Sequence, residues 1–320
     1  MKLRTVCILL FLTLPFSSLF AKGSQETHPK APDSATIEVS HDLGTTRVPI
    51  NPSRVLVFDL GALDILHEAG IDIIGLGKGA TLPSHLASYE NPTNYPVTGS
   101  LHEPDFEKVY DLRPELILIG GRAATAYDEL SKIAPTVLIS LPDADYLGTL
   151  AQNIGIISAI FPEKAQTLKQ SMQSLVDASE HVQQHVQKSG YTALFLMVNA
   201  GNLSVFGPGS RFSLIHDTFA FLPADETINS STHGQSSSFE YLLQQDPDFL
   251  FVLDRGAATT TGTQRSAAQA LLDNDVVRKM KAFKNQRIVY VDPVSWYVAS
   301  GGIESTRVMI KDVEAALSLY

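Results

Sequence analysis

The chain has 320 residues, of which 44% are hydrophobic and 18% charged, values typical of a globular protein with one large domain or two of ordinary size. Its formal net charge of -10 argues against nucleic acid or an anionic lipid surface as a partner. The only cysteine is Cys7, so the chain beyond its N-terminus has no disulfide, thiolate metal site or cysteine nucleophile.

Residues 1–21 have the three parts of a secretory signal peptide. Lys2 and Arg4 precede a short apolar run at 6–16, and small residues lead to Ala21. These flanks favour a signal peptide over a buried N-terminal helix, and no later stretch approaches ~18 uninterrupted apolar residues. We therefore expect an exported protein without direct membrane insertion, whose net charge changes from -10 to -12 when Lys2 and Arg4 are removed.

Residues 22–40 are polar and contain proline, which predicts a flexible leader. Strands and helices then alternate along the chain. Strands are predicted at 54–60, 72–77, 115–120 and 136–141, and helices at 61–70, 105–112 and 124–133. This alternation predicts a parallel sheet with helices on its faces, in an N-terminal α/β lobe of residues 41–161.

Residues 162–189 contain no glycine and no internal proline, and their apolar side chains recur at helical spacing. Pro162 begins this segment and Gly190 ends it. At 1.5 Å per residue, a helix of this length spans roughly 42 Å. We expect it to link the first lobe to a second one.

The second half resumes the alternation in a C-terminal α/β lobe of residues 190–320. Two strands at 192–198 and 203–207 are predicted to form a hairpin. The remaining predicted segments are a helix at 211–221, a polar loop at 229–238, a helix at 239–245, a strand at 249–253, a helix near 266–282, a strand at 287–292 and a C-terminal helix. The sequence thus predicts two α/β lobes joined by one long helix.

One unit occurs twice. "FEKVYDLRPELILIGGR" (106–122) and "FEYLLQQDPDFLFVLDR" (239–255) align at an offset of 133 residues. The identical pairs are Phe106/Phe239, Glu107/Glu240, Pro114/Pro247 and Arg122/Arg255. Apolar matches are expected of any two buried strands, whereas a packed core needs neither the repeated Glu nor the repeated Arg.

A candidate site lies where the strands end, because ligands of open parallel sheets bind outside the carboxyl ends of the strands. The residues predicted to meet there are Arg122, from the first lobe, and Arg211, His233, Arg255 and Tyr297, from the second. Arg211 follows "GPGS" and is predicted to open a helix whose free N–H groups favour an anion. Plainer interpretations are surface arginines, a polar loop histidine, and a tyrosine packed beside Trp296.

Other motifs are weak. His181 and His185 have the i, i+4 spacing of a metal pair, but no third ligand is near them in the sequence, so we interpret them as a solvated helix face. "GLGKG" (75–79) lacks the full dinucleotide-binding spacing, and no G-x-S-x-G, H-E-x-x-H or P-loop occurs. An exported hydrolase using His233 with Asp254 or Ser238 therefore lacks a nucleophile motif.

Four stretches carry a resemblance: "FEKVYDLRPELILIGGR", "GPGSRFSLIHD", "THGQSSSFEYLLQQDPDFLFVLDRG" and "VDPVSWYVASGG". They resemble the periplasmic ferric-siderophore-binding proteins of the enterochelin-uptake type, from about residue 35 to the end. The resemblance implies the class III fold, with two Rossmann-like lobes joined by a single long helix. It also implies a receptor without a catalytic step or an intrinsic cofactor, located in the periplasm. The lipid-attachment cysteine of some relatives is absent.

The resemblance also implies roles for single residues. Arg122, Arg211 and Arg255 would meet the negative charge of an iron(III)-catecholate siderophore. His233 and Tyr297 would complete the coordination of the metal when the siderophore supplies only four oxygens. Such ligands suit iron(III), which prefers anionic oxygen and accepts imidazole. A haem or corrinoid receptor of the same fold is the second interpretation, although three arginines argue against an uncharged corrinoid.

The same resemblance gives Glu107 and Glu240 a role at the inner-membrane ABC permease, with one acidic residue per lobe docking the loaded receptor. The plainer interpretation is that a carboxylate in the first turn of a helix is favoured by the helix dipole. We expect a monomer whose partners are the ferric siderophore and the permease, with no nucleic acid partner.

Overall fold

The computed structural model describes residues 35–79, 81–139, 145–228, 233–259 and 267–318. The predicted signal peptide and residues 22–34 of the predicted leader lie outside these ranges. Residues 35–320 form one compact unit. In the part of the chain that the structure describes, no helix combines the length and the apolar character needed to cross a membrane.

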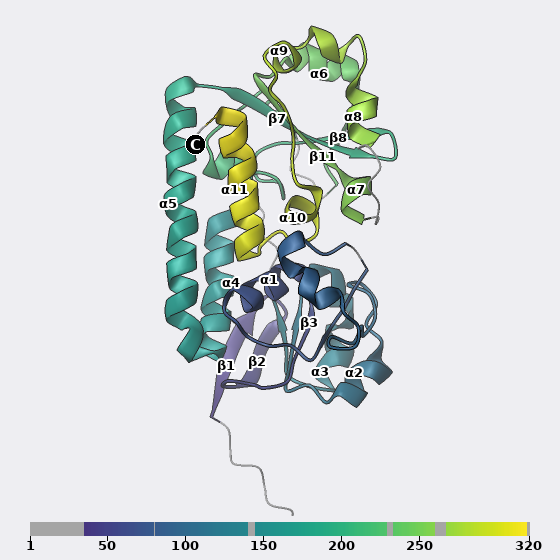
Figure 1. Cartoon of the computed structure of the whole chain (residues 1–320), viewed down its shortest axis with the longest axis vertical. Coiled ribbons are helices and arrows are strands. Elements are labelled where there is room, and N and C mark those ends of the chain that lie inside the picture. The colour runs from purple at the N-terminus through teal and green to yellow at the C-terminus, as the bar shows by residue number, and fades with distance from the viewer. Residues whose placement is uncertain (1–34, 80, 140–144, 229–232, 260–266, 319–320) are drawn as a thin grey trace, which may run out of the picture. The chain divides into compact units, whose positions relative to one another are not determined.

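The first sheet confirms the predicted parallel arrangement. It contains β3 (Val55–Phe58), β4 (Gly75–Leu76), β5 (Leu116–Ile119) and β6 (Thr136–Leu138) in the order β4-β3-β5-β6, all parallel (Figure 1). Every residue of β3 and β5 is buried, as expected for parallel strands covered on both faces. The helices of this half include α1 (Leu60–Glu68), the 3-10 helix η1 (Ser84–Glu90), α2 (Phe106–Leu112), the 3-10 helix η2 (Gly121–Ala126) and α3 (Tyr127–Ser131).

Several elements of the first half differ from the sequence prediction. Residues 36–40, predicted as leader, belong to β1 (Thr36–His41), which pairs with β2 (Gly44–Pro49) in an antiparallel hairpin. Val39 and Val48 anchor this hairpin in the core. Helix α4 (Tyr146–Ile160) was not predicted. Its two glycines and four isoleucines are weak helix formers, so its stability depends on packing against α5.

The long helix is confirmed. A 3-10 turn at Pro162–Lys164 leads into α5 (Ala165–Ser189), which ends at Gly190. The helix runs along one side of the molecule past both sheets, and α4 and α11 (Ile303–Leu317) pack against it (Figure 1). Its buried face consists of Leu168, Leu175, Ser179, Val182 and Val186.

The second sheet is mixed. It contains β7 (Thr192–Asn199), β8 (Asn202–Phe206), β9 (Leu222–Pro223), β10 (Gln235–Ser237), β11 (Phe249–Asp254) and β12 (Ile288–Tyr290). Its order is β10-β8-β7-β11-β12, with β9 also on β7. Strand β8 is antiparallel to β7, which confirms the predicted hairpin, and to β10, which lies within the predicted polar loop.

One predicted helix of the second half is confirmed and another is divided. Helix α6 (Phe239–Gln245) matches its prediction, and α7 (Arg255–Thr259) and α10 (Pro293–Tyr297) follow strand ends. The predicted helix near 266–282 is divided into α8 (Ala267–Leu272), a 3-10 turn at Val277–Lys279 (η5), and α9 (Lys281–Lys284). The side chain of Asn274 accepts hydrogen bonds from the N–H groups of Val276 and Val277, which ends α8 in a turn.

The predicted helix at 211–221 is wrong. Only a five-residue π-helical turn, Leu214–Thr218, forms there, and Arg211 lies in the turn before it. The hydroxyl of Ser210 donates to the carbonyl of Gly207 and accepts from the N–H of Phe212, so local side-chain bonds hold the chain in turns. The prediction that Arg211 opens an anion-binding helix therefore fails, and any role of Arg211 rests on its own guanidinium.

Candidate ligand-binding site

Tyr297 lies among three arginine side chains that come from distant parts of the chain. The guanidinium carbons of Arg211, Arg255 and Arg122 lie 4.6, 5.5 and 5.9 Å from the centre of its ring. Arg255 follows β11, Arg122 lies in η2 after β5, and Arg211 lies in the turn after β8. Chain segments that follow strands of both sheets thus meet at one residue.

The arginines contact different atoms of Tyr297. The Nε of Arg255 donates to the phenolic Oη at 2.8 Å. An Nη of Arg211 donates to the backbone carbonyl of Tyr297 at 3.0 Å, and an Nη of Arg122 donates to the same carbonyl at 2.9 Å. Arg122 also donates to the carbonyl of Val298 at 3.4 Å. Arg255 therefore engages the oxygen that could bind a metal, whereas Arg122 holds the backbone behind it.

The guanidinium of Arg211 is strongly desolvated. Burial lowers the pKa of its guanidinium to about 10, and the nearby charges of Arg122 and Arg255 act in the same direction. The side chain remains protonated at neutral pH. Three cations gathered in a partly dry site repel one another, and an anionic ligand would relieve that repulsion.

A pocket of about 440 Å³ opens beside this cluster. Its lining residues are Met197, Asn199, Asn202, Ser204, Phe206, Arg211, His233, Arg255 and Tyr297. Four of the five predicted site residues are among them. Arg122 is not among them, and its guanidinium donates to the carbonyls of Tyr297 and Val298.

His233 is exposed and lies two residues before β10. Gly234, next to it, has φ +74, and a Cβ there would come within 2.7 Å of the ring of Phe206. Glycine thus lets the chain turn closely over Phe206 before β10 begins. His233 is thereby held at the edge of the pocket with its side chain accessible to a ligand.

Tyr297 is anchored on one side by the helix that carries it. Asp292 caps α10 by accepting from the N–H of Ser295. The neighbouring Trp296 is buried, with its indole Nε1 donating to Asp312 at 2.8 Å. Burial raises the pKa of Asp312 to about 6. These contacts fix α10 against α11.

On the other side, Asp64 of α1 anchors the chain that follows Tyr297. Its carboxylate is fully buried and accepts from the N–H groups of Glu304 and Ser305 and from the hydroxyl of Ser305. It thereby caps α11, which has no side-chain cap of its own. A Cβ on Gly302 would lie 2.3 Å from Asp64, so glycine permits this approach. No motif or periodicity in the sequence indicates this contact, whose partners are 240 residues apart.

Glu107 and Glu240 occupy matching places at the starts of α2 and α6, and both are exposed. The N-cap of α2 is Asp105, which accepts from the N–H of Lys108, and the N-cap of α6 is Ser238, which accepts from the N–H of Tyr241. Neither glutamate is therefore required as the capping residue. The pKa of Glu240 is lowered by backbone and Ser238 hydrogen bonds at the helix start.

His181 and His185 lie on α5, with His181 exposed. Among the described residues, no cluster of three or more His, Cys, Asp or Glu could hold a metal ion by itself. His233 and Tyr297 would accordingly need oxygen atoms of a ligand to complete a metal site.

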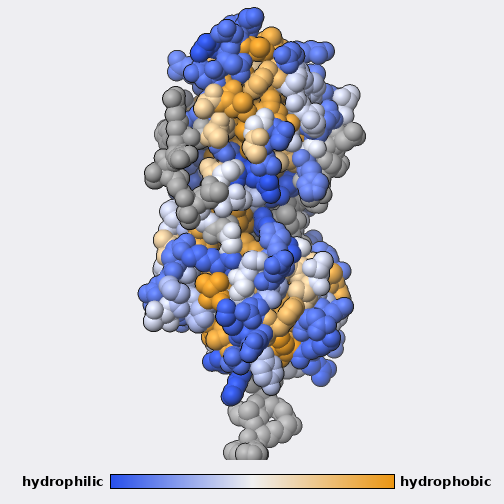
Figure 2. Space-filling view, turned by 90° about the vertical axis from the view of Figure 1, so that its right-hand side faces the viewer, coloured by the Kyte–Doolittle hydropathy of each residue, from blue (hydrophilic) through white to orange (hydrophobic). Residues whose placement is uncertain are grey.

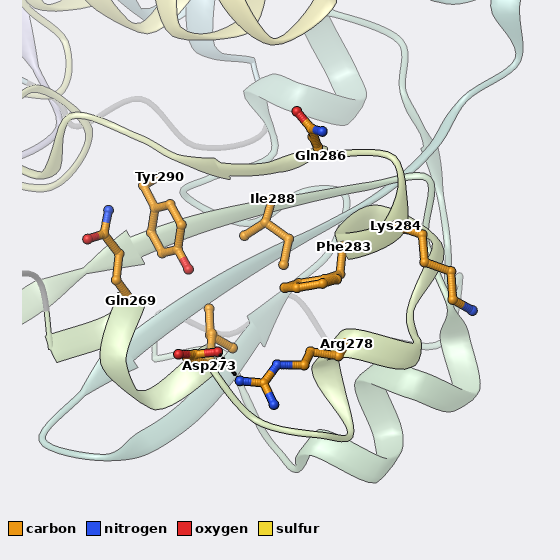
Figure 3. A pocket seen from close by; sticks show the side chains of 9 residues that line it. Gln269, Asp273, Arg278, Phe283, Lys284, Gln286, Ile288 and Tyr290 are labelled. Carbon is orange, nitrogen blue, oxygen red and sulfur yellow. Dashed lines mark hydrogen bonds and ion pairs between the residues drawn. The ribbon is translucent and has the colours of Figure 1, made fainter.

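A larger pocket of about 720 Å³ lies elsewhere, on α8, α9 and β12 (Figure 3). Phe283, Ile288 and Tyr290 form its apolar wall, and Arg278 pairs with Asp273 on the opposite side (Figure 3). The surface of this half of the molecule shows an apolar strip between hydrophilic areas (Figure 2). None of the predicted site residues lines this pocket, so size alone does not identify the site.

The two sheets, the long helix that links them in the chain and the pocket at the strand ends together define a substrate-binding protein of the class III periplasmic binding protein fold. The chain belongs to the periplasmic binding protein family, whose model matches residues 56–294.

Its relatives include siderophore receptors. The petrobactin-binding protein YclQ of Bacillus subtilis is 40% identical over 316 residues, covering 97% of this chain and 98% of the relative. The ferric-anguibactin-binding protein FatB of Vibrio anguillarum is 33% identical, covering 88% of each chain.

Two solved structures of related proteins have a similar fold. The crystal structure of YclQ has a TM-score of 0.84 and covers 89% of this chain and 100% of its own. The periplasmic catecholate-siderophore binding protein VctP from Vibrio cholerae has a TM-score of 0.83 at 35% identity, covering 88% of this chain and 100% of its own.

Proposed function

We propose that this protein binds an iron(III)-catecholate siderophore in the pocket beside Tyr297 and delivers it to an inner-membrane ABC permease. The observation that carries the proposal is the convergence of Arg211, Arg255, His233 and Tyr297 on one pocket. The relatives named for petrobactin and anguibactin, and the solved catecholate-siderophore receptor, support the same ligand class.

The charges suit this ligand. A ferric bis-catecholate is anionic, and one arginine at ~4 Å contributes roughly 4 kcal/mol of gross Coulomb energy at an effective dielectric near 20. Arginine also presents a planar fork of donors to oxygen and loses hydration more readily than lysine. Arg211 and Arg255 line the pocket, and Arg122 adds its charge from behind Tyr297. An overall acidic chain thereby acquires a local site for an anion.

The donor atoms suit the metal. Iron(III) prefers anionic oxygen and accepts imidazole nitrogen, which are the donors that Tyr297 and His233 supply. When a tetradentate siderophore leaves two positions open, these side chains would fill them. The phenolic oxygen already accepts from Arg255, and this contact would help stabilise the phenolate on the metal.

A hydrolytic role for His233 finds no support in the contacts of its proposed partners. The hydroxyl of Ser238 caps α6 by accepting from the N–H of Tyr241. The carboxylate of Asp254 accepts from the N–H groups of Ala257 and Ala268. Both groups therefore serve the backbone, and the family consists of substrate-binding proteins.

Delivery would use Glu107 and Glu240, which are exposed at equivalent helix starts while other residues provide the caps. We propose that each docks on a basic pocket of the permease. Export by the N-terminal signal would place the protein in the periplasm, where it would act as a monomer.

The test is titration of the purified protein with ferric bis-catecholate, ferric tris-catecholate and ferric hydroxamate complexes, followed by fluorescence. Trp296 is the only tryptophan and adjoins Tyr297, so bound iron should quench its emission. Tight binding of the catecholates and not of the hydroxamate is expected. Binding of none of the three would refute the proposal.

The metal ligands are tested by Tyr297→Phe and His233→Ala. Each should weaken binding of the tetradentate complex and change its charge-transfer band, while affecting a hexadentate complex less. Equal losses for both complexes would instead indicate that the two residues serve packing.

A further inference from the structure

One side of the pocket, which we call the floor, has no proposed role in binding iron. It consists of Met197, Asn199, Asn202, Ser204 and Phe206. These five of the pocket's nine lining residues come from the β7–β8 hairpin. Met197 pairs with Ser204, and Asn199 pairs with Asn202, while Phe206 is two residues beyond Ser204 on β8. Because side chains alternate between the two faces of a strand, these five share the face toward the pocket. The floor is therefore a built surface of the sheet and not a loop.

This floor is uncharged. Met197 and Phe206 are buried and form its apolar part, whereas Asn199, Asn202 and Ser204 are partly or fully exposed and carry amides and a hydroxyl. Among the described residues that line the pocket, none is a carboxylate, and the only permanent cations are Arg211 and Arg255. A protonated amine on the floor would find no opposite charge and would lie near these arginines.

The polar groups of the floor are available for a ligand. Asn202 donates through Nδ2 to the backbone carbonyl of Asn199. The amide oxygen of Asn202 can therefore accept a hydrogen bond from a ligand. The side chains of Asn199 and Ser204 have no hydrogen-bond partner among the described residues. Asparagine offers both donors and an acceptor, and a serine hydroxyl does the same. A ligand group with one N–H and one C=O matches them, whereas a hydrocarbon would leave them unpaired at a cost.

The exposed polar part of the floor is also offset from Arg255. Arg255 follows Asp254 of β11, which pairs with Val198 of β7, and β8 is one strand further. Asn202 and Ser204 thus belong to a strand about 10 Å from β11, two strand spacings away. Because the phenolic oxygen of Tyr297 lies 2.8 Å from Arg255, a ligand whose metal lies at Tyr297 must extend across the sheet toward β8 to reach them. The part of a siderophore that does so is the linker between its catechol groups.

We propose that Asn199, Asn202 and Ser204 form a subsite that recognises uncharged secondary amides in the linker of the siderophore. This inference rests on the proposed function and narrows it. The arginines and Tyr297 select the anionic iron centre, and the hairpin selects the chemistry that joins the chelating groups. The subsite discriminates between siderophores that present the same iron centre.

The experiment compares two ferric complexes with identical catechols. In one the catechols are joined by a diamide linker, and in the other by an all-methylene linker of the same length. The wild-type protein should bind the diamide complex about tenfold more tightly, the effect of one to two neutral hydrogen bonds. The double variant Asn199→Leu/Ser204→Ala should bind both complexes with nearly equal affinity. Ser204→Ala alone, a small change that preserves the strand, should reduce the preference by about threefold.

Matched controls are Ser236→Ala and Asn94→Leu. Ser236 lies opposite Ser204 on β10 but does not line the pocket, and Asn94 is an exposed loop residue of the first lobe. Both should retain the full preference. Equal affinity of the wild-type protein for the two complexes, or an undiminished preference in both Ser204→Ala and the double variant, would overturn the subsite. Failure of both complexes to bind at all would refute the proposed function itself and the subsite with it.

Discussion

The segments 106–122 and 239–255 build the same unit in the two halves of the molecule. In each, a seven-residue helix ends at a residue in the left-handed conformation, Arg113 with φ 46° and Asp246 with φ 42°. A proline and an acidic residue then lead into a buried strand. The repeat noticed in the sequence therefore extends to backbone conformation.

The acidic residue after the proline makes equivalent hydrogen bonds in both units. Glu115 accepts from the N–H and hydroxyl of Ser53, two residues before β3. Asp248 accepts from the N–H and hydroxyl of Thr192, at the start of β7. Each carboxylate thus ties its own strand to the beginning of the parallel neighbour. This pairing explains why Glu115 and Asp248 align.

The two units differ at their last residue. Arg255 donates to the phenolic oxygen of Tyr297, whereas Arg122 donates to backbone carbonyls behind it. One arginine addresses the atom that would bind the ligand's metal, and the other supports the chain that carries this atom. Equivalent positions in a repeat therefore acquire different roles because the site between them is not symmetric.

The largest expected effect concerns the repeated glutamates. Changing both Glu107 and Glu240 to Lys should abolish siderophore-dependent iron uptake in cells, because two docking contacts become repulsive. Siderophore affinity and thermal stability of the purified protein should stay nearly unchanged. Glu226→Lys reverses an exposed charge outside both helices and serves as the control. Normal uptake by the double variant would leave the glutamates only a helix-dipole role.

Substitutions of Arg255 and Arg122 should have different effects on the affinity for ferric bis-catecholate. Arg255→Gln should weaken binding of ferric bis-catecholate by ~1.5–3 kcal/mol, the value of a charge-assisted hydrogen bond. Arg122→Gln should weaken it less, because Arg122 does not line the pocket. It should instead lower the free energy of unfolding by about 1 kcal/mol through the lost carbonyl contacts. Titration and urea unfolding measure the two quantities, and identical losses of affinity would contradict the asymmetry.

These contrasts show what the sequence could predict. The linking helix, the parallel strands and the convergence of arginines with Tyr297 follow from hydrophobic periodicity and from the rule on strand ends. The direction of Arg122 does not, because its partners are backbone carbonyls 175 and 176 residues away. The cap that Asp64 provides for α11 could not be predicted from the sequence either, since only tertiary packing brings α1 and α11 together.

The helices that the sequence predicted wrongly differ from the prediction for local reasons. Helix α4 contains two glycines and several β-branched residues, which weaken its helical signal. The turn at Asn274 and the turns around Ser210 arise from side-chain hydrogen bonds that compete with helix formation. Such competition depends on small free-energy differences between local conformations, so periodicity alone extends the helices too far.

Glu115 and Asp248 should differ by a smaller amount in what they contribute to the free energy of unfolding. Asp248→Ala should lower the free energy of unfolding by about 2 kcal/mol, because it leaves the partly buried N–H of Thr192 without its partner. Glu115→Ala should cost about 1 kcal/mol, since Glu115 and its partners are exposed and water replaces it. Urea unfolding measures both. A larger cost at Glu115 would mean that the first tie is the stronger one.

The smallest effect concerns the left-handed residues that end the two helices. A non-glycine residue in this conformation is strained, so Arg113→Gly should stabilise the protein by about 0.5–1 kcal/mol. Asp246→Gly relieves the same strain but removes a carboxylate that accepts from the N–H of Lys281 at 2.7 Å. That loss offsets the gain, and the variant should be no more stable than the wild type. Thermal unfolding of both variants, with Ser318→Gly as a third left-handed position near the C-terminus, tests the argument. Equal stabilisation by Arg113→Gly and Asp246→Gly would show that the bond between Asp246 and Lys281 contributes nothing to the second unit.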